Sequence, residues 1–134
     1  MTQFDKRNLS MMMDFYEMTM SYGYFRQTHG DVRVAFDLFF RSVPDRGGYA
    51  VFAGLEHVIE FVENLSFSDE DIDYFRAQNL FSEEFLSFLR GFRFRGDIYA
   101  VPEGTIIYPN EPLMTIVAPI IDAQLIETAI LAQI

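Results

Sequence analysis

Asp14 and Tyr16 lie two positions apart in an apolar N-terminal segment, residues 11–25, with the sequence MMMDFYEMTMSYGYF. An aromatic ring such as that of Tyr16 can stack on a flat ligand. The pattern of the segment alone favours a packing role for this ring, in a core or an interface, over ligand binding. Tyr16 is therefore a candidate ligand contact that needs support from elsewhere in the chain.

Arg41 stands at the end of an alternating apolar segment and precedes a loop that contains Arg46, Gly47 and Gly48. A guanidinium group on a rigid strand end can hold a phosphate group through two parallel hydrogen bonds. The competing interpretation is a charge that reaches solvent where a strand ends. Arg41 is thus the second candidate ligand contact, and its ligand would be an anion.

The sequence contains no complete catalytic motif, so no catalytic residue is assigned. Glycine-rich phosphate loops, the HExxH metal motif and the GxSxG nucleophile motif are all absent. The chain has no cysteine, which excludes a disulfide framework, a thiolate zinc site and a cysteine nucleophile. His29 and His57 are expected at the surface, and two histidines are too few for a histidine-rich metal site.

The charge balance limits the class of partner. The net charge of −10 and the pI of about 4.4 argue against nucleic acid or an anionic membrane, because both need a basic face. There is no uncharged apolar stretch of about eighteen residues and no signal-peptide pattern, so a cytoplasmic location is expected. Acidic residues concentrate in residues 56–84, which predicts a solvated face of surface helices. A small basic patch, Arg90, Arg93 and Arg95, is expected to pair with these acidic helices.

Hydrophobic periodicity predicts the elements that must position the candidate residues. Residues 10–25 predict a helix capped by its first serine; because it is apolar on every face, it must contact more than one surface. Residues 31–41 alternate and predict a strand. Residues 51–65 predict an amphipathic helix, and residues 68–78 and 82–91 predict two shorter helices with serine caps.

The C-terminal part changes character at residue 92. Residues 92–119 contain alternating segments separated by proline turns, which predict an antiparallel β meander. Residues 119–134 predict a very apolar helix with no polar end. The chain, residues 1–134, is therefore expected to be one α+β domain, a fragment or split subunit whose last helix leads into a further domain. Open apolar area on the first and last helices predicts self-association.

Three long motifs, in order, carry a resemblance to a known family. They are DFYEMTMSYGYF, AFDLFFRSVPDRGGYAVFAGLE and GDIYAVPEGTIIYPNEPLMTIVAPIIDAQLIETAIL. Together they resemble the N-terminal region of nicotinate phosphoribosyltransferase, from about residue 9 to residue 134. Because several motifs occur in sequence over nearly the whole chain, the resemblance is specific.

The resemblance implies an enzyme that joins nicotinate to phosphoribosyl pyrophosphate, giving nicotinate mononucleotide and pyrophosphate on the salvage route to NAD. It implies ATP hydrolysis through a phosphorylated histidine, with ATP and Mg²⁺ as cofactors of the full-length enzyme and none bound to this chain. The implied fold is the N-terminal α/β sandwich domain of a type II phosphoribosyltransferase, with the barrel domain absent. Subunits of the family dimerise head to tail, so a homodimer is implied.

The resemblance also implies roles for single residues. Tyr16 matches the tyrosine that stacks on the pyridine ring from the neighbouring subunit, and Asp14 matches the acid near the same pocket. Arg41 matches an arginine that reaches the phosphates of phosphoribosyl pyrophosphate. Neither His29 nor His57 matches the phosphohistidine, which belongs to the barrel. The chain alone is therefore expected to be inactive.

Two alternatives remain open at the level of the sequence. The chain could be a non-catalytic binding or assembly subunit that docks a separately encoded barrel. It could also belong to the quinolinate-using relative, whose N-terminal domain has similar architecture, although the FDLFFR and D-x-Y strings speak against this.

Overall fold

The computed structural model describes residues 8–28 and 31–134 of the chain. In chain order the elements within them are α1 (Phe15–Thr28), β1 (Arg33–Leu38), a 3-10 turn η1 (Pro44–Arg46), β2 (Ala50–Val51), α2 (Leu55–Asn64), α3 (Asp69–Ala77), α4 (Glu83–Arg90), β3 (Asp97–Ala100), β4 (Ile106–Ile107), β5 (Met114–Pro119) and α5 (Ile120–Gln133).

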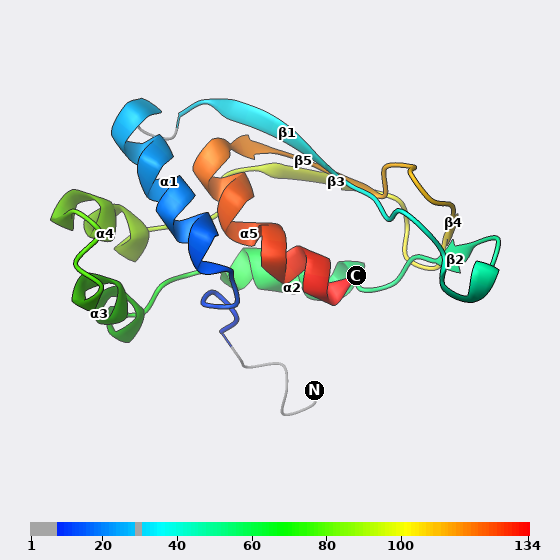
Figure 1. Cartoon of the computed structure of the whole chain (residues 1–134), viewed down its shortest axis with the longest axis horizontal. Coiled ribbons are helices and arrows are strands. Elements are labelled where there is room, and N and C mark those ends of the chain that lie inside the picture. Colours follow the sequence, from blue (N-terminus) through cyan, green and yellow to red (C-terminus); the bar gives the residue numbers. More distant parts are fainter. Residues whose placement is uncertain (1–7, 29–30) are drawn as a thin grey trace.

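Two antiparallel sheets organise the strands (Figure 1). The larger sheet has the order β1-β5-β3, with Arg33 opposite Pro119 and Leu38 opposite Met114. The smaller sheet pairs β2 with β4. The predicted α+β class with an antiparallel sheet is confirmed, but the strands do not follow one another as a simple meander. β4 pairs with β2 in the smaller sheet and does not join β3 and β5. Residues 92–95, which were predicted to form a strand, are irregular.

Helix α5 is the centre of the domain. It packs against β1 and β5 on one side and against α1 and α2 on others, as Figure 1 shows. Eight of its residues are buried, from Ile121 to Ile130. The prediction of open apolar surface on the last helix is therefore wrong for most of the length of α5. Its largely apolar sequence reflects enclosure within this domain, and exposed large side chains begin only at Leu131.

Helix α1 contacts more than one surface, as its apolar sequence predicts. One side packs on α5, and a second side places Tyr22 and Phe25 against Phe85 of α4, with ring centroids 5.2 and 5.3 Å apart. A third side is open, because Phe15 and Met20 are exposed. The helix begins at Phe15 and not at Ser10, whose hydroxyl instead accepts a hydrogen bond from the Ser66 backbone at 3.0 Å.

The serine caps of the acidic helices are confirmed. Ser68 and Asp71 form a reciprocal capping box, and the Ser82 hydroxyl accepts from the Phe85 backbone. Arg90 pairs with Asp69 of α3 at 3.3 Å, as expected of a basic patch beside acidic helices. Arg95 has a different partner, the buried carboxylate of Asp122 near the start of α5.

Helix α2 begins four residues later than predicted, because Val51 lies in β2 and is exposed. The start of α2 is fixed by two contacts that tie it to distant segments. Glu103 accepts hydrogen bonds from the backbone of Gly54 and Leu55 at 2.9 and 3.0 Å. Gly54 has a φ of 103°, and a Cβ there would lie 2.1 Å from the Gln133 carbonyl oxygen at the end of α5. Glycine is therefore required where α2 and α5 meet.

Candidate functional site

Tyr16 lies in the first turn of α1, with 44% of its surface exposed. Its hydroxyl donates a hydrogen bond to Oε1 of Glu127 on α5, at 3.3 Å. Partial burial, and then the negative charges of Glu127 and Glu17, raise the pKa of the Tyr16 phenol. The ring is thus anchored at its polar end, stays protonated at neutral pH and still presents surface to a ligand.

Asp14 lies directly before α1 and is exposed. Its backbone carbonyl accepts a hydrogen bond from the Glu17 backbone at 3.0 Å, which closes the first turn of the helix. Its carboxylate is close enough to contribute to the raised pKa values of Tyr16 and Glu17. The structure therefore brings Asp14 and Tyr16 together at the N-terminal end of α1.

Glu17 is a buried acid that sequence reasoning missed as a site residue. Its Oε1 accepts hydrogen bonds from the backbone N–H of Thr128, at 3.0 Å, and from the Thr128 hydroxyl. Its Oε2 has no hydrogen-bond partner among the residues that the structure describes. Burial raises the pKa of its carboxyl group, against the opposing effect of the two Thr128 bonds. The signal in the sequence was an acid inside an otherwise apolar helix, but it did not reveal the partner.

Arg41 follows β1 by three residues and is exposed, so its guanidinium group is free to reach a ligand. The adjoining strand end is held by the turn before β5, where the Asn110 backbone donates to the Phe40 carbonyl at 2.8 Å. Arg46 lies in η1 with a φ of 56°, an uncommon conformation for a residue other than glycine. Arg41 and Arg46 therefore belong to one short loop beside β2.

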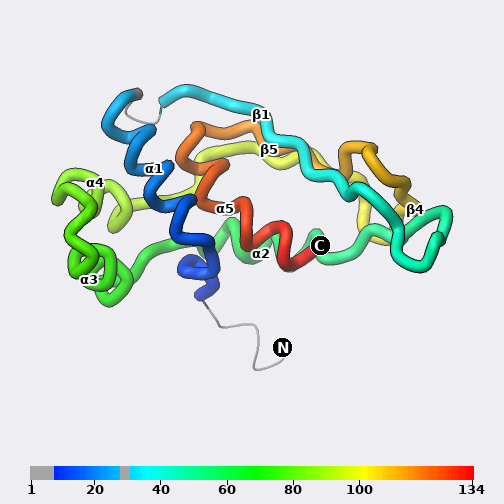
Figure 2. Tube along the Cα trace, viewed as in Figure 1, coloured from blue at the N-terminus to red at the C-terminus, as the bar shows by residue number. Residues whose placement is uncertain are grey.

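The structure does not bring Arg41 and Tyr16 together. Figure 2 shows the chain after β1 running toward β4, whereas the first turn of α1 lies beside α5 in the middle of the molecule. Within one chain the two candidate contacts therefore belong to separate surfaces.

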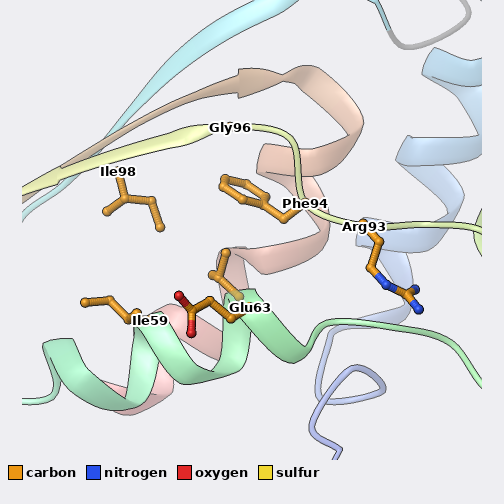
Figure 3. A pocket seen from close by; sticks show the side chains of 7 residues that line it. Ile59, Glu63, Arg93, Phe94, Gly96 and Ile98 are labelled. Carbon is orange, nitrogen blue, oxygen red and sulfur yellow. The ribbon is translucent and has the colours of Figure 1, made fainter.

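A groove of about 310 Å³ lies elsewhere, between α2 and the segment that leads into β3. Its lining is mainly apolar: Ile59, Val62, Glu63, Arg93, Phe94, Gly96 and Ile98. Figure 3 shows Ile59 and Glu63 on the helix facing Phe94 and Ile98. None of the three residues proposed from the sequence lines this groove.

The part of the chain that the structure describes contains no group of three or more histidine, cysteine or acidic side chains able to hold a metal ion. His57 is exposed on α2, as expected, and His29 lies outside the described residues. Among the described helices, none has the length and apolar character needed to cross a bilayer.

A family model of the nicotinate phosphoribosyltransferase (NAPRTase) N-terminal domain matches residues 11–134. The chain belongs to this family. It is 46% identical over 125 residues to nicotinate phosphoribosyltransferase pncB2 of Mycobacterium tuberculosis, covering 93% of this chain and 27% of that protein. It is 43% identical over 128 residues to the nicotinate phosphoribosyltransferase of Bacillus subtilis, covering 96% of this chain and 26% of the relative.

A solved structure of a human relative agrees with the nicotinate phosphoribosyltransferase assignment. Human nicotinic acid phosphoribosyltransferase superposes with a TM-score of 0.83 at 30% identity, covering 90% of this chain and 25% of the human chain. Nicotinate-nucleotide pyrophosphorylase from Pyrococcus furiosus superposes with a TM-score of 0.68 at 21% identity, which shows a shared fold alone. The chain thus spans about a quarter of the length of the relatives it matches.

Proposed function

We propose that this chain is the N-terminal domain of a nicotinate phosphoribosyltransferase. The complete enzyme would join nicotinate and phosphoribosyl pyrophosphate to form nicotinate mononucleotide and pyrophosphate, with ATP hydrolysis, in the cytoplasm. The observation that carries the proposal is the family match over residues 11–134. The last helix would lead into a barrel domain, and residues 1–134 alone would lack transferase activity.

Tyr16 is the residue proposed to stack on the pyridine ring of nicotinate. Support comes from its exposed ring, which is tethered by its hydroxyl to Glu127 and is therefore partly oriented before a ligand arrives. Asp14 is proposed to flank the same pocket, since it is exposed at the start of the same helix.

Arg41 is proposed to contact the phosphates of phosphoribosyl pyrophosphate, because an exposed guanidinium beside a short loop suits bidentate contact with phosphate. The separation of Arg41 from Tyr16 within one chain fits a pocket assembled from two subunits. We therefore propose a homodimer in which Tyr16 of one chain completes the active site of the other.

ATP and Mg²⁺ are proposed to bind outside this domain. The described residues do not fit a metal site, since they offer no cluster of three suitable side chains, and His57 is an exposed helix residue. Neither His29 nor His57 matches the phosphohistidine of the family, which is proposed to lie in the barrel, so this domain takes no part in the ATP-dependent step of the proposed reaction.

The test compares substrate dependence in variants of the complete enzyme. Tyr16→Ala should raise the KM for nicotinate about five-fold or more, because a stacked aromatic contact contributes on the order of 1 kcal/mol beyond burial, and it should leave the KM for phosphoribosyl pyrophosphate unchanged. Arg41→Ala should show the opposite pattern. Tyr99→Ala, on an exposed strand residue, and Arg46→Ala are matched controls that should change neither constant.

The alternative of a non-catalytic assembly subunit has its own outcome in the same set of experiments. An unchanged nicotinate KM in Tyr16→Ala would remove this residue from the pocket. The 134-residue chain alone can be incubated with nicotinate, labelled phosphoribosyl pyrophosphate and ATP. Formation of nicotinate mononucleotide would contradict the proposal that residues 1–134 need the barrel domain for activity. A stop codon directly after Ile134 would favour the separate subunit, and a continuing reading frame would favour the single-chain enzyme.

A further inference from the structure

Glu127 connects the exposed Tyr16 side chain to the interior of the domain. One carboxylate oxygen, Oε1, accepts from the Tyr16 hydroxyl at 3.3 Å, and the other, Oε2, accepts from the side-chain amide of Gln124 at 2.9 Å. Gln124 is buried, with 4% of its surface exposed. The carboxylate of Glu127 is therefore held between two donors, the buried amide of Gln124 and the hydroxyl of Tyr16.

A second link fixes the backbone of α1 beside this contact. Glu17 follows Tyr16 and accepts two hydrogen bonds from Thr128, which follows Glu127. Consecutive residues of α1 thus meet consecutive residues of α5. The Tyr16–Glu127 distance is long for a hydrogen bond between two oxygens, so the side-chain contact alone would hold the ring loosely. The Glu17–Thr128 link supplies the register that keeps the two side chains opposite each other.

The surrounding charges favour the hydroxyl as a donor. Burial first, and then the negative charges of Glu127, Glu17 and Asp14, raise the pKa of the phenol, so Tyr16 keeps its proton at neutral pH. The O–H bond of the protonated phenol points toward its acceptor, the carboxylate of Glu127 on α5. The phenol oxygen lies on the axis about which the ring turns, so the contact with Glu127 fixes where the outer end of the ring lies. The O–H bond prefers the plane of the ring, so the direction of the acceptor also favours one ring plane.

We propose that Glu127 is a positioning residue for nicotinate binding, which holds the Tyr16 hydroxyl and thereby sets the face of the ring that the pyridine ring meets. This inference rests on the proposed role of Tyr16. Glu127 does not touch the substrate in this proposal, and its whole effect on nicotinate passes through the Tyr16 hydroxyl.

The experiment is a double-mutant cycle in the complete enzyme, with Tyr16→Phe, Glu127→Ala and both together. Each single variant should raise the KM for nicotinate about three- to five-fold without changing the KM for phosphoribosyl pyrophosphate, since either change releases the ring. The double variant should be no worse than either single variant, because both remove one interaction. Glu127→Gln keeps an acceptor oxygen and should restore the nicotinate KM. Glu56→Ala, at an exposed acid of α2, is the control.

A spectroscopic measurement covers the case in which Glu127→Ala impairs folding. In the 134-residue chain with ¹³C-labelled tyrosine, Glu127→Gln should lower the pKa of the Tyr16 ring, because the neighbouring negative charge is removed. An unchanged Tyr16 titration would overturn the contact itself.

The outcomes separate this inference from the proposed function. If Tyr16→Ala raises the nicotinate KM but Glu127→Ala does not, the positioning role is wrong and the pocket assignment stands. Additive effects in the cycle, or equal effects on both substrates, would likewise overturn the positioning role. If Tyr16→Ala itself leaves the nicotinate KM unchanged, Tyr16 is not in the pocket, and the positioning role of Glu127 is wrong with it.

Discussion

At the scale of single residues, Glu17 combines a stabilising and a destabilising environment. One oxygen accepts two hydrogen bonds from Thr128, while the other is buried without a partner in residues 8–28 and 31–134. Within the same described part of the chain, the hydroxyl of Ser21, one helical turn further along α1, is also buried without a partner. The charged form of Glu17 is therefore disfavoured at the oxygen that is buried without a donor, and burial raises the pKa of the carboxyl group for that reason.

Glu17→Gln should raise the free energy of unfolding by about 1 kcal/mol at pH 7.5, because the amide keeps an acceptor for Thr128 and removes a buried charge. The pKa of Glu17 is higher in the folded than in the unfolded chain. Its contribution to stability is therefore present below the unfolded pKa and is lost as the pH rises through the folded pKa. The gain from glutamine should accordingly shrink as the pH falls toward 4.

Urea unfolding of both proteins at the two pH values measures this difference, with the exposed Glu56→Gln as control. A larger gain at acid pH than at neutral pH would show that the Thr128 bonds to the charged carboxylate outweigh its burial.

The residue scale also shows what the sequence could and could not predict of the candidate site. Asp14 and Tyr16 lie close together along the chain, so their shared location follows from one helix. Glu127 and Thr128 lie 111 residues from their partners, and no local pattern reports such a contact. Periodicity describes the face of a helix, whereas the pairing of two faces depends on the tertiary packing of α1 on α5.

At the scale of elements, local chemistry predicted most helices and fewer of the strands. The serine caps of α3 and α4 were predictable because the capping hydroxyl and the backbone N–H that donates to it lie only three residues apart. The start of α2 was not, because it depends on Glu103 and on the end of α5. The order of the strands could not be predicted either, since the pairing of β4 with β2 joins residues that lie 55 and 57 positions apart in the chain.

The junction between β3 and α5 is the element contact whose loss should be most damaging. Asp122 is fully buried and accepts three hydrogen bonds from Arg95: one from its backbone, at 2.9 Å, and two from its guanidinium, at 2.7 and 3.3 Å. Asp122 also lies in the first turn of α5, where a negative charge is favourable. This one carboxylate therefore joins the segment before β3 to the central helix.

Asp122→Ala should lower the free energy of unfolding by about 3 kcal/mol, because it leaves a backbone N–H and part of a guanidinium without their acceptor. Asp97→Ala breaks a second arginine–carboxylate contact, with Arg33 at 3.7 Å, between exposed side chains. Its effect should be below about 1 kcal/mol. Chemical denaturation of both variants tests the difference, and equal losses would refute the special role of the buried contact.

At the scale of the whole molecule, the exposed apolar surface is smaller and differently placed than the sequence predicts. Helix α5 is enclosed, so the open apolar area near the candidate nicotinate contact belongs to α1, where Phe15, Tyr16 and Met20 are each more than 40% exposed. These three side chains lie on one side of the first two turns. An apolar face that carries a proposed substrate contact is the part of this domain that a second subunit would cover.

The chain should therefore self-associate through this face of α1. Met20→Glu places a charge there, and burying that charge would raise the dissociation constant at least about tenfold, an unfavourable change of about 1.4 kcal/mol. Leu80→Glu, at an exposed residue between α3 and α4, is the matched control and should leave association unchanged. Sedimentation velocity over a range of concentrations measures both. A monodisperse monomer at high concentration would contradict self-association, and an equal effect of the two variants would move the contact away from α1.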